Sequence, residues 1–138
     1  MRVLLDTCVL SELQNPKGSA VVRRAVEAVD EDDLFVSMIS LGEIAKGVAL
    51  LPGSAKRRRL NDWLGGLESG YGERLLPVDR ETGHIWGEIT AGAQKRGDTL
   101  GASDGLVAAT ALRHGLHVMT RNVKDFEPAN VLVINPFA

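Results

Sequence analysis

Residues 1–12 read Met-Arg-Val-Leu-Leu-Asp-Thr-Cys-Val-Leu-Ser-Glu, and this opening stretch decides the fold. Its apolar run Val3-Leu4-Leu5 is typical of a strand that is buried on both faces of a parallel sheet. Asp6 follows where such a strand leaves the sheet, and in open α/β sheets ligands gather at that edge. Asp6 could instead cap a helical segment that contains Val9 and Leu10, because Asp is a favoured N-cap residue. Taken alone, the stretch favours the capping role, and the rest of the chain decides between the two.

Beyond residue 12 the chain alternates short apolar runs with patterns of helical spacing. Strands are expected at 34–36, 75–78, 117–120 and 131–134, and helices at 19–29, 40–51, 55–70, 79–96 and 103–114. Strands that alternate with helices indicate a parallel sheet covered on both faces. The predicted fold is therefore α/β, a three-layer α/β/α sandwich with a mostly parallel central sheet of about five strands. No linker or repeat interrupts residues 1–138, so we expect a single domain.

The composition is that of an ordinary globular protein. The 138 residues carry a formal net charge of -2, which gives no overall attraction to nucleic acid or to an anionic membrane. Cys8 is the single cysteine; we expect a small buried thiol rather than a nucleophile, in a reducing cytosol. No apolar run reaches the ~18 residues of a membrane span, and Asp6 interrupts the start too early for a signal peptide. We therefore expect a cytoplasmic protein without a membrane partner.

Four acidic residues stand at strand ends or helix starts, and each has a local explanation. Asp6 could act as a cap, and Glu43 could complete a Ser-x-x-Glu capping box with Ser40. Asp104 would suit the first turn of its helix, and Asp125 could shape a turn. In a parallel sheet, however, all four positions lie along the same carboxyl edge. Carboxylates crowded there call for a cation, and Mg²⁺ and Mn²⁺ prefer such oxygen ligands, so the joint placement predicts a divalent-metal site.

Other kinds of site find little support in the sequence. His84, His114 and His117 lack the spacing of zinc ligands and have no cysteine partner nearby. There is no Walker-type phosphate loop and no G-x-G-x-x-G after a strand. No serine stands in a convincing arrangement with a histidine and an acid, so nucleophilic serine chemistry is not expected.

Four short motifs resemble those of the PIN-domain nucleases. They are Leu4-Leu5-Asp6-Thr7, Ser37-x-x-Ser40-x-x-Glu43, Ala102-Ser103-Asp104 and Thr120-Arg121-Asn122-x-x-Asp125-Phe126. The motifs occur in the family's order, at suitable separations, and span essentially the whole chain. Residues 131–137, which end in Asn-Pro-Phe, make the chain most similar to the FitB-like branch of the VapC toxins, which belong to bacterial toxin–antitoxin pairs.

The resemblance implies a Mg²⁺- or Mn²⁺-dependent endoribonuclease that hydrolyses RNA phosphodiester bonds. Asp6, Glu43 and Asp104 match the three central metal-binding acids of the family, which are also its catalytic residues. The fourth acid matches Asp125, while some relatives place their acid where this chain has Asn122. Asn122 is therefore kept as a possible ligand or as a hydrogen-bonding neighbour of the ligands.

Two further sets of residues are candidates for supporting roles. By resemblance, the Thr7 and Thr120 hydroxyls would support the metal ligands or contact the substrate. The basic run contains Lys56, Arg57, Arg58 and Arg59. These cations could contact RNA phosphates, which would make binding dependent on salt. A solvated helix start explains the same run equally well.

The resemblance also implies partners. Relatives form homodimers, are inhibited by a cognate antitoxin that directs an arginine toward the acidic pocket, and reach operator DNA only through that antitoxin. The alternative function is a catalytically weak or inactive subunit, which would mainly bind an antitoxin and support autorepression at the operator. The presence of all four acids favours the enzyme.

Overall fold

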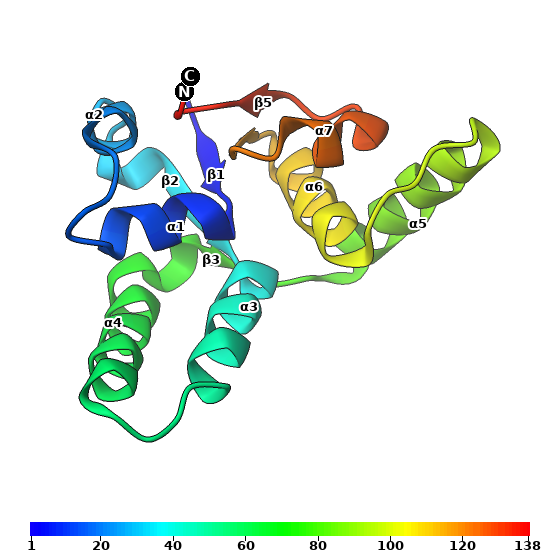
Figure 1. The fold of residues 1–138 in the computed structure, drawn as a ribbon. Coiled ribbons are helices and arrows are strands. Elements are labelled where there is room, and N and C mark those ends of the chain that lie inside the picture. The colour runs from blue at the N-terminus through cyan, green and yellow to red at the C-terminus, as the bar shows by residue number, and fades with distance from the viewer.

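The computed structural model describes residues 1–138 and contains a five-stranded parallel sheet (Figure 1). The strands are β1 (Val3–Leu5), β2 (Leu34–Ser37), β3 (Leu75–Leu76), β4 (His117–Met119) and β5 (Val133–Ile134). Their order is β3-β2-β1-β4-β5, and every neighbouring pair is parallel. The opening strand therefore lies at the centre of the sheet, and the predicted mostly parallel sheet is parallel throughout.

Helices cover both faces of this sheet. They are α1 (Thr7–Gln14), α2 (Ala20–Glu27), α3 (Met38–Ala49), α4 (Ala55–Tyr71), α5 (Arg80–Lys95), α6 (Ala102–His114) and α7 (Val123–Phe126), with 3₁₀ turns at Glu31–Asp33, Gly72–Arg74 and Glu127–Ala129. Helices α1, α2 and α4 pack against one core cluster, and α5, α6 and α7 against the other. Figure 1 separates the same two groups, which confirms the three-layer sandwich. None of the helices is both long and apolar enough to cross a membrane.

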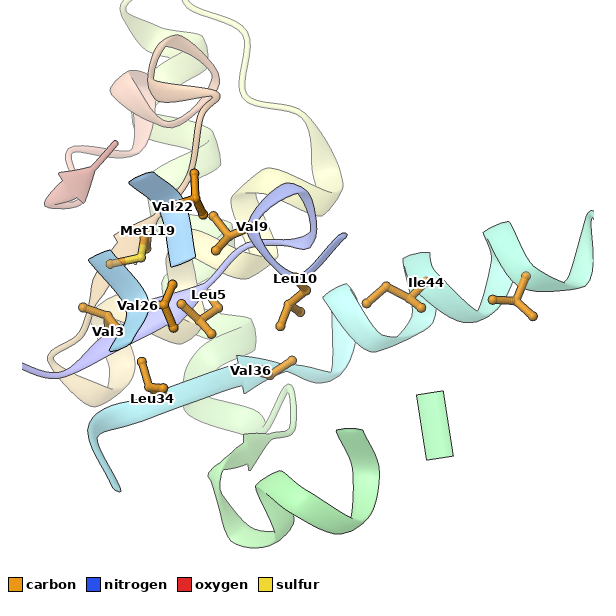
Figure 2. Packing of buried hydrophobic residues seen from close by; sticks show 11 residues of the cluster. Val3, Leu5, Val9, Leu10, Val22, Val26, Leu34, Val36, Ile44 and Met119 are labelled. Carbon is orange, nitrogen blue, oxygen red and sulfur yellow. The ribbon is translucent and has the colours of Figure 1, made fainter. Parts of the chain in front are cut away.

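The central strand β1 is fixed from both sides. Val3 and Leu5 face the first core cluster, where they pack with Val22 and Val26 of α2 (Figure 2). Leu4 faces the second cluster, and all three side chains of β1 are fully buried. Burial of each large aliphatic side chain stabilises the fold by about 1.5–3 kcal/mol. The residue that follows β1 is consequently held at a well-defined position.

Several predicted boundaries differ from the structure. Helix α3 begins at Met38 rather than at Ser40, because the Ser37 hydroxyl accepts a hydrogen bond from the Ile39 amide and caps the helix two residues earlier. The strand predicted at 75–78 ends before Pro77, which cannot donate to a neighbouring strand. Of the strand predicted at 131–134, only Val133 and Ile134 are in β5.

Two short segments after strand ends are helical where the sequence indicated less order. Residues 7–14 form the complete helix α1, and the turn expected around Asp125 is the four-residue helix α7. Helix α5 begins at Arg80, and of Asp79 and Thr82, which could both have capped it, Asp79 is the cap: its carboxylate accepts hydrogen bonds from the amide and the hydroxyl of Thr82 at 2.8 and 2.7 Å. These short helices bring further residues to the carboxyl edge of the sheet.

Candidate active site

The sheet order places a topological switch point at the carboxyl ends of β1 and β4. From β1 the chain proceeds outward through β2 and β3, and it then returns to the other side of β1 as β4 and β5. In open α/β sheets such a switch point is where ligands bind. Asp6 directly follows β1 and Thr120 directly follows β4 at this switch point, and the Asp6 amide donates to the Met119 carbonyl at 3.0 Å.

The Asp6 carboxylate faces β4 rather than its own helix. The Thr120 hydroxyl donates to Oδ2 of Asp6 at 2.8 Å, and both residues are buried. Asp6 occupies the N-cap position of α1, but its side chain makes no capping hydrogen bond; only its carbonyl accepts from Val9 and Leu10. The capping interpretation of the Asp6 side chain is therefore wrong. Its Oδ1 atom has no hydrogen-bond partner within the protein and remains available to a ligand.

Cys8 lies beside this pair as a free, half-buried cysteine. Its sulfur lies 3.8 Å from Oδ2 of Asp6 and 3.5 Å from Oγ1 of Thr120, and it accepts a hydrogen bond from the Arg121 amide at 3.5 Å. These contacts link the residues that follow β1 to those that follow β4. Cys8 packs against the first core cluster, but it is half-buried rather than fully buried as expected.

Glu43 projects from the second turn of α3 and is held by Thr7. The Thr7 hydroxyl donates to Oε1 of Glu43 at 2.8 Å, which leaves Oε2 without a partner. The predicted capping box of Ser40 and Glu43 is wrong, because Ser40 lies inside α3 and its amide does not reach the Glu43 carboxylate. The Ser40 hydroxyl is buried and has no hydrogen-bond partner.

Asp104 shows that the four acids share one electrostatic environment. It lies in the first turn of α6, where partial burial and, to a smaller extent, the charges of Asp6, Asp125 and Glu43 together raise the pKa of its carboxyl from 3.8 to about 6. Like charges raise a carboxyl pKa only when they lie within a short range. The structure therefore brings Asp6, Glu43, Asp104 and Asp125 together at the carboxyl edge of the sheet.

Asn122 and Asp125 line one open hollow of about 420 Å³ beyond β4. The Asn122 amide donates to Oγ1 of Thr120 at 3.0 Å, while the Asn122 side chain is exposed and makes no capping bond to α7. Asp125 is exposed on α7. The charge of Asp125 contributes to the raised pKa of the Asp104 carboxyl.

The basic run does not act as one patch. Lys56 lines a groove of about 300 Å³ between α1, α3 and α4, together with Thr7 and Glu43. Arg57 turns back and donates to the Leu51 carbonyl at 3.3 Å. The side chains of Arg58 and Arg59 are exposed and make no hydrogen bond or ion pair, as in a solvated helix start. Of the run, Lys56 alone therefore shares a groove with one of the four acids, Glu43.

One residue at this edge was missed by the sequence analysis. Arg121 directly follows Thr120, and its guanidinium carbon lies 3.8 Å from the centroid of the Phe137 ring. The position of an arginine immediately after a predicted strand end was the only available signal. The aromatic partner is 16 residues away in the chain, and its proximity depends on β5 lying beside β4.

Comparison with known proteins identifies the family of this fold and edge. A family model described as "PIN domain" matches residues 3–129. The chain belongs to the PIN domain family. The VapC ribonuclease Y4jK of Sinorhizobium fredii is 32% identical over 98% of this chain and 97% of its own length. The toxin FitB of Neisseria gonorrhoeae is 35% identical over 98% of both chains.

Solved structures agree with this assignment. FitAcB from Neisseria gonorrhoeae superposes on this PIN domain with a TM-score of 0.92 at 34% identity, over 98% of each chain. FitAB bound to the IR36 DNA fragment gives the same TM-score of 0.92 at 33% identity, over 99% of this chain and 96% of the other. The predicted resemblance to VapC toxins of the FitB type is thereby confirmed.

The donor atoms at the edge of this PIN domain suit a hard divalent cation. They are carboxylate oxygens, and two of the four carboxylates are already oriented by threonine hydroxyls. No three acidic, histidine or cysteine side chains are close enough to enclose an ion by themselves, although the acids influence one another's charge. The two observations agree for a hard divalent cation that would draw some of its ligands from these carboxylates and the rest from water.

Proposed function

We propose that this PIN domain is a divalent-metal-dependent endoribonuclease and the toxin component of a type II toxin–antitoxin pair. The observation that carries the proposal is the convergence of four carboxylates at the switch point beside β1 and β4. The similarity to a VapC ribonuclease and to the toxin FitB supports RNA as the substrate and toxicity as the role. The reaction would be hydrolysis of RNA phosphodiester bonds.

Asp6, Glu43, Asp104 and Asp125 are the residues that would hold Mg²⁺, or Mn²⁺ in its place. Asn122 is the alternative to Asp125 as an oxygen ligand. When bound, a divalent cation offsets the negative charge of the phosphodiester and lowers the pKa of a water molecule that can then attack phosphorus. The all-oxygen donor set at this edge supports a hard cation of this type.

Residues of the chain orient the carboxylates of the site, and one of the carboxyl groups can hold a proton. Thr120 fixes Asp6 and Thr7 fixes Glu43, so each carboxylate keeps one oxygen free. The raised pKa of Asp104 allows its carboxyl group to hold a proton near pH 6. Two of the three histidines lie away from the acids: His117 opens β4, at the opposite end of the strand from Thr120, and His114 ends α6, at the opposite end of the helix from Asp104.

The groove between α1, α3 and α4 supports the proposal that an antitoxin binds to this protein. It is polar where Thr7 and Glu43 line it and apolar where Leu60 and Trp63 do. An amphipathic antitoxin segment could lay apolar side chains on Trp63 and direct an arginine to Glu43, which would exclude substrate. We further propose a cytoplasmic homodimer that reaches operator DNA only through its antitoxin and has no membrane partner.

Cleavage of RNA by purified, antitoxin-free protein tests the proposal. We expect cleavage of a broad panel of single-stranded and structured RNAs in Mg²⁺ or Mn²⁺, and no cleavage in excess EDTA or by Asp6→Asn. Cleavage that persists in Asp6→Asn would reveal a contaminating nuclease and remove the support for these residues. A protein that leaves every RNA intact, yet binds the product of a neighbouring gene tightly, would instead be the inactive antitoxin-binding subunit.

A further inference from the structure

Arg121 differs from the other arginines that stack on aromatic rings. Three guanidinium groups lie over rings: Arg2 over Phe35, Arg74 over Tyr71 and Arg121 over Phe137. Arg2 also donates to one backbone carbonyl and Arg74 to three, so these two guanidinium groups serve the fold.

Arg121, in contrast, makes no side-chain hydrogen bond and no ion pair, and its side chain is exposed. Stacking restricts the side chain while all five N–H donors of its guanidinium remain free. A restrained guanidinium with unused donors is well suited to bind an oxyanion.

Both partners of this stack are anchored by adjacent parallel strands. The Thr120 amide donates to the Ile134 carbonyl at 2.9 Å, which joins the ends of β4 and β5 just before the residues in question. The Asn135 side chain accepts from the Phe137 amide at 3.0 Å and fixes the turn after β5. The Phe137 ring packs against the first core cluster. The ring is thus a fixed platform, and Arg121 lies on it.

The surroundings of Arg121 point to an anion. The hollow of about 420 Å³ beyond β4 is lined by Arg121, Asn122, Val123, Lys124, Asp125 and Asn135. It therefore places two cations beside an acid of the cluster, and neither Arg121 nor Lys124 forms an ion pair with Asp125. Four carboxylates repel a polyanion, and the net charge of -2 offers no compensating attraction. A local cation at the rim would correct this repulsion.

We propose that the hollow beyond β4 is a binding site for an RNA backbone phosphate, in which Arg121, held against the Phe137 ring, contacts a phosphate next to the one that is cleaved. The inference rests on the proposed ribonuclease function and adds where the strand passes. The position of the hollow gives the path of the RNA strand, which would continue from the acid cluster across Asp125 toward the C-terminal turn. Lys124 supplies a second, unstacked cation on the same rim.

RNA binding measured apart from cleavage tests this site. A labelled single-stranded RNA is titrated in an Asp104→Asn background, in Mg²⁺, with a gel to verify that the RNA stays intact. Arg121→Ala should raise the Kd about tenfold and reduce the slope of log K against log salt by about 0.7, the value for one phosphate contact to a single strand. Arg24→Ala removes the same charge from an exposed position on α2 and should change neither quantity.

The role of the Phe137 ring is tested separately, through RNA binding by two further variants. Arg121→Lys should retain the salt slope but lose part of the affinity, because lysine lacks the planar fork. Phe137→Leu should weaken binding when Arg121 is present and have no further effect in Arg121→Ala. If the Asp104→Asn parent binds RNA and the added Arg121→Ala changes the Kd by less than about twofold, the proposed phosphate site is wrong and the ribonuclease proposal stands. If the wild type cleaves no RNA and the parent binds none, the proposed function fails and the site with it.

Discussion

The hydroxyl of Thr120 donates a 2.8 Å hydrogen bond to Oδ2 of Asp6, joining two residues that are 114 positions apart in the chain. The bond exists because β4 returns to lie beside β1, so that the residues that follow the two strands meet at the carboxyl edge. It satisfies one oxygen of a buried carboxylate and leaves the other without a partner in the protein. The strand order of the sheet therefore determines how the carboxylate of Asp6, a candidate metal ligand, is oriented.

Replacement of Thr120 by Val should therefore impair both the site and the fold. Val keeps the shape but removes the donor to Asp6 and the acceptor of the Asn122 amide. We expect RNA cleavage to fall about 10–100-fold, as for other groups that orient metal ligands, with a loss of about 1–3 kcal/mol in unfolding free energy. Thr120→Ser retains the hydroxyl and should restore most activity. Wild-type cleavage rates in Thr120→Val would contradict the orienting role.

The second hydroxyl–carboxylate pair should matter less. Thr7 donates to Glu43 at the same 2.8 Å, but Glu43 is exposed, and water can replace a donor there. We expect Thr7→Val to reduce cleavage by less than about tenfold and to leave the melting temperature nearly unchanged. Rates measured side by side for Thr7→Val and Thr120→Val provide the test. A larger effect at Thr7 would mean that the Thr7 hydroxyl contacts substrate directly.

Asp104 should make the metal-free protein less stable as the pH rises. Its pKa is about 6 in the folded chain against an ordinary 3.8, so the folded state binds a proton that the unfolded state has already released. The protonated group stabilises the fold below about pH 4, and this contribution is lost as the pH rises toward 6 and above. In a buried group such a pKa change would correspond to about 3 kcal/mol, which the exposure of Asp104 reduces to about 1 kcal/mol.

Urea unfolding in EDTA between pH 4 and pH 8 measures this effect. Asp104→Asn should be more stable than the wild type by about 1 kcal/mol at pH 8 and should lose that advantage near pH 4. Asp62→Asn, an exposed acid on α4, is the matched control and should follow the wild type at every pH. Parallel pH profiles for wild type and Asp104→Asn would contradict the raised pKa of Asp104 in the folded chain.

Gly105 lies beside Asp104 and should tolerate no side chain without adjustment. A Cβ atom there would lie 3.0 Å from Nε1 and 3.1 Å from Cδ1 of Trp86, so the indole or the start of α6 must move. We expect Gly105→Ala to cost about 1–3 kcal/mol, with a change in tryptophan fluorescence and reduced cleavage. Gly87→Ala meets no atom within 4 Å on α5 and should stabilise the helix by about 0.5–1 kcal/mol. Equal stability of the two variants would contradict the close packing of Trp86.

The sequence predicted the parts of this molecule that depend on local pattern. The apolar run of β1 and the helical spacing around it were enough for the sandwich, because burial on both faces leaves a clear signature. The cap of α3 was misassigned, since Ser37 and Ser40 are both suitable caps and only the end of β2 selects Ser37. Helix α7 has four residues, too few for a periodic pattern to appear.

The contacts between distant residues could not be predicted in the same way. That Thr120 reaches Asp6, and that Arg121 reaches Phe137, depends on which strands are neighbours in the sheet. The four acids could be grouped only by the general rule that parallel strands share a carboxyl edge. That rule predicted the meeting point of the acids but not the hydroxyl groups that orient them.

The most direct test of the central claim is the Mg²⁺-dependent rate of RNA cleavage by four isosteric variants and one control. Asp6→Asn, Glu43→Gln, Asp104→Asn and Asp125→Asn each remove one charge from the cluster, while Asp62→Asn removes the same charge from an exposed position on α4. We predict that each cluster variant loses at least about 100-fold in rate, without loss of folded structure, and that the control matches the wild type. Cleavage at wild-type rates by Asp6→Asn or Asp104→Asn, or an equal loss in Asp62→Asn, would contradict a metal-dependent active site built on these four acids.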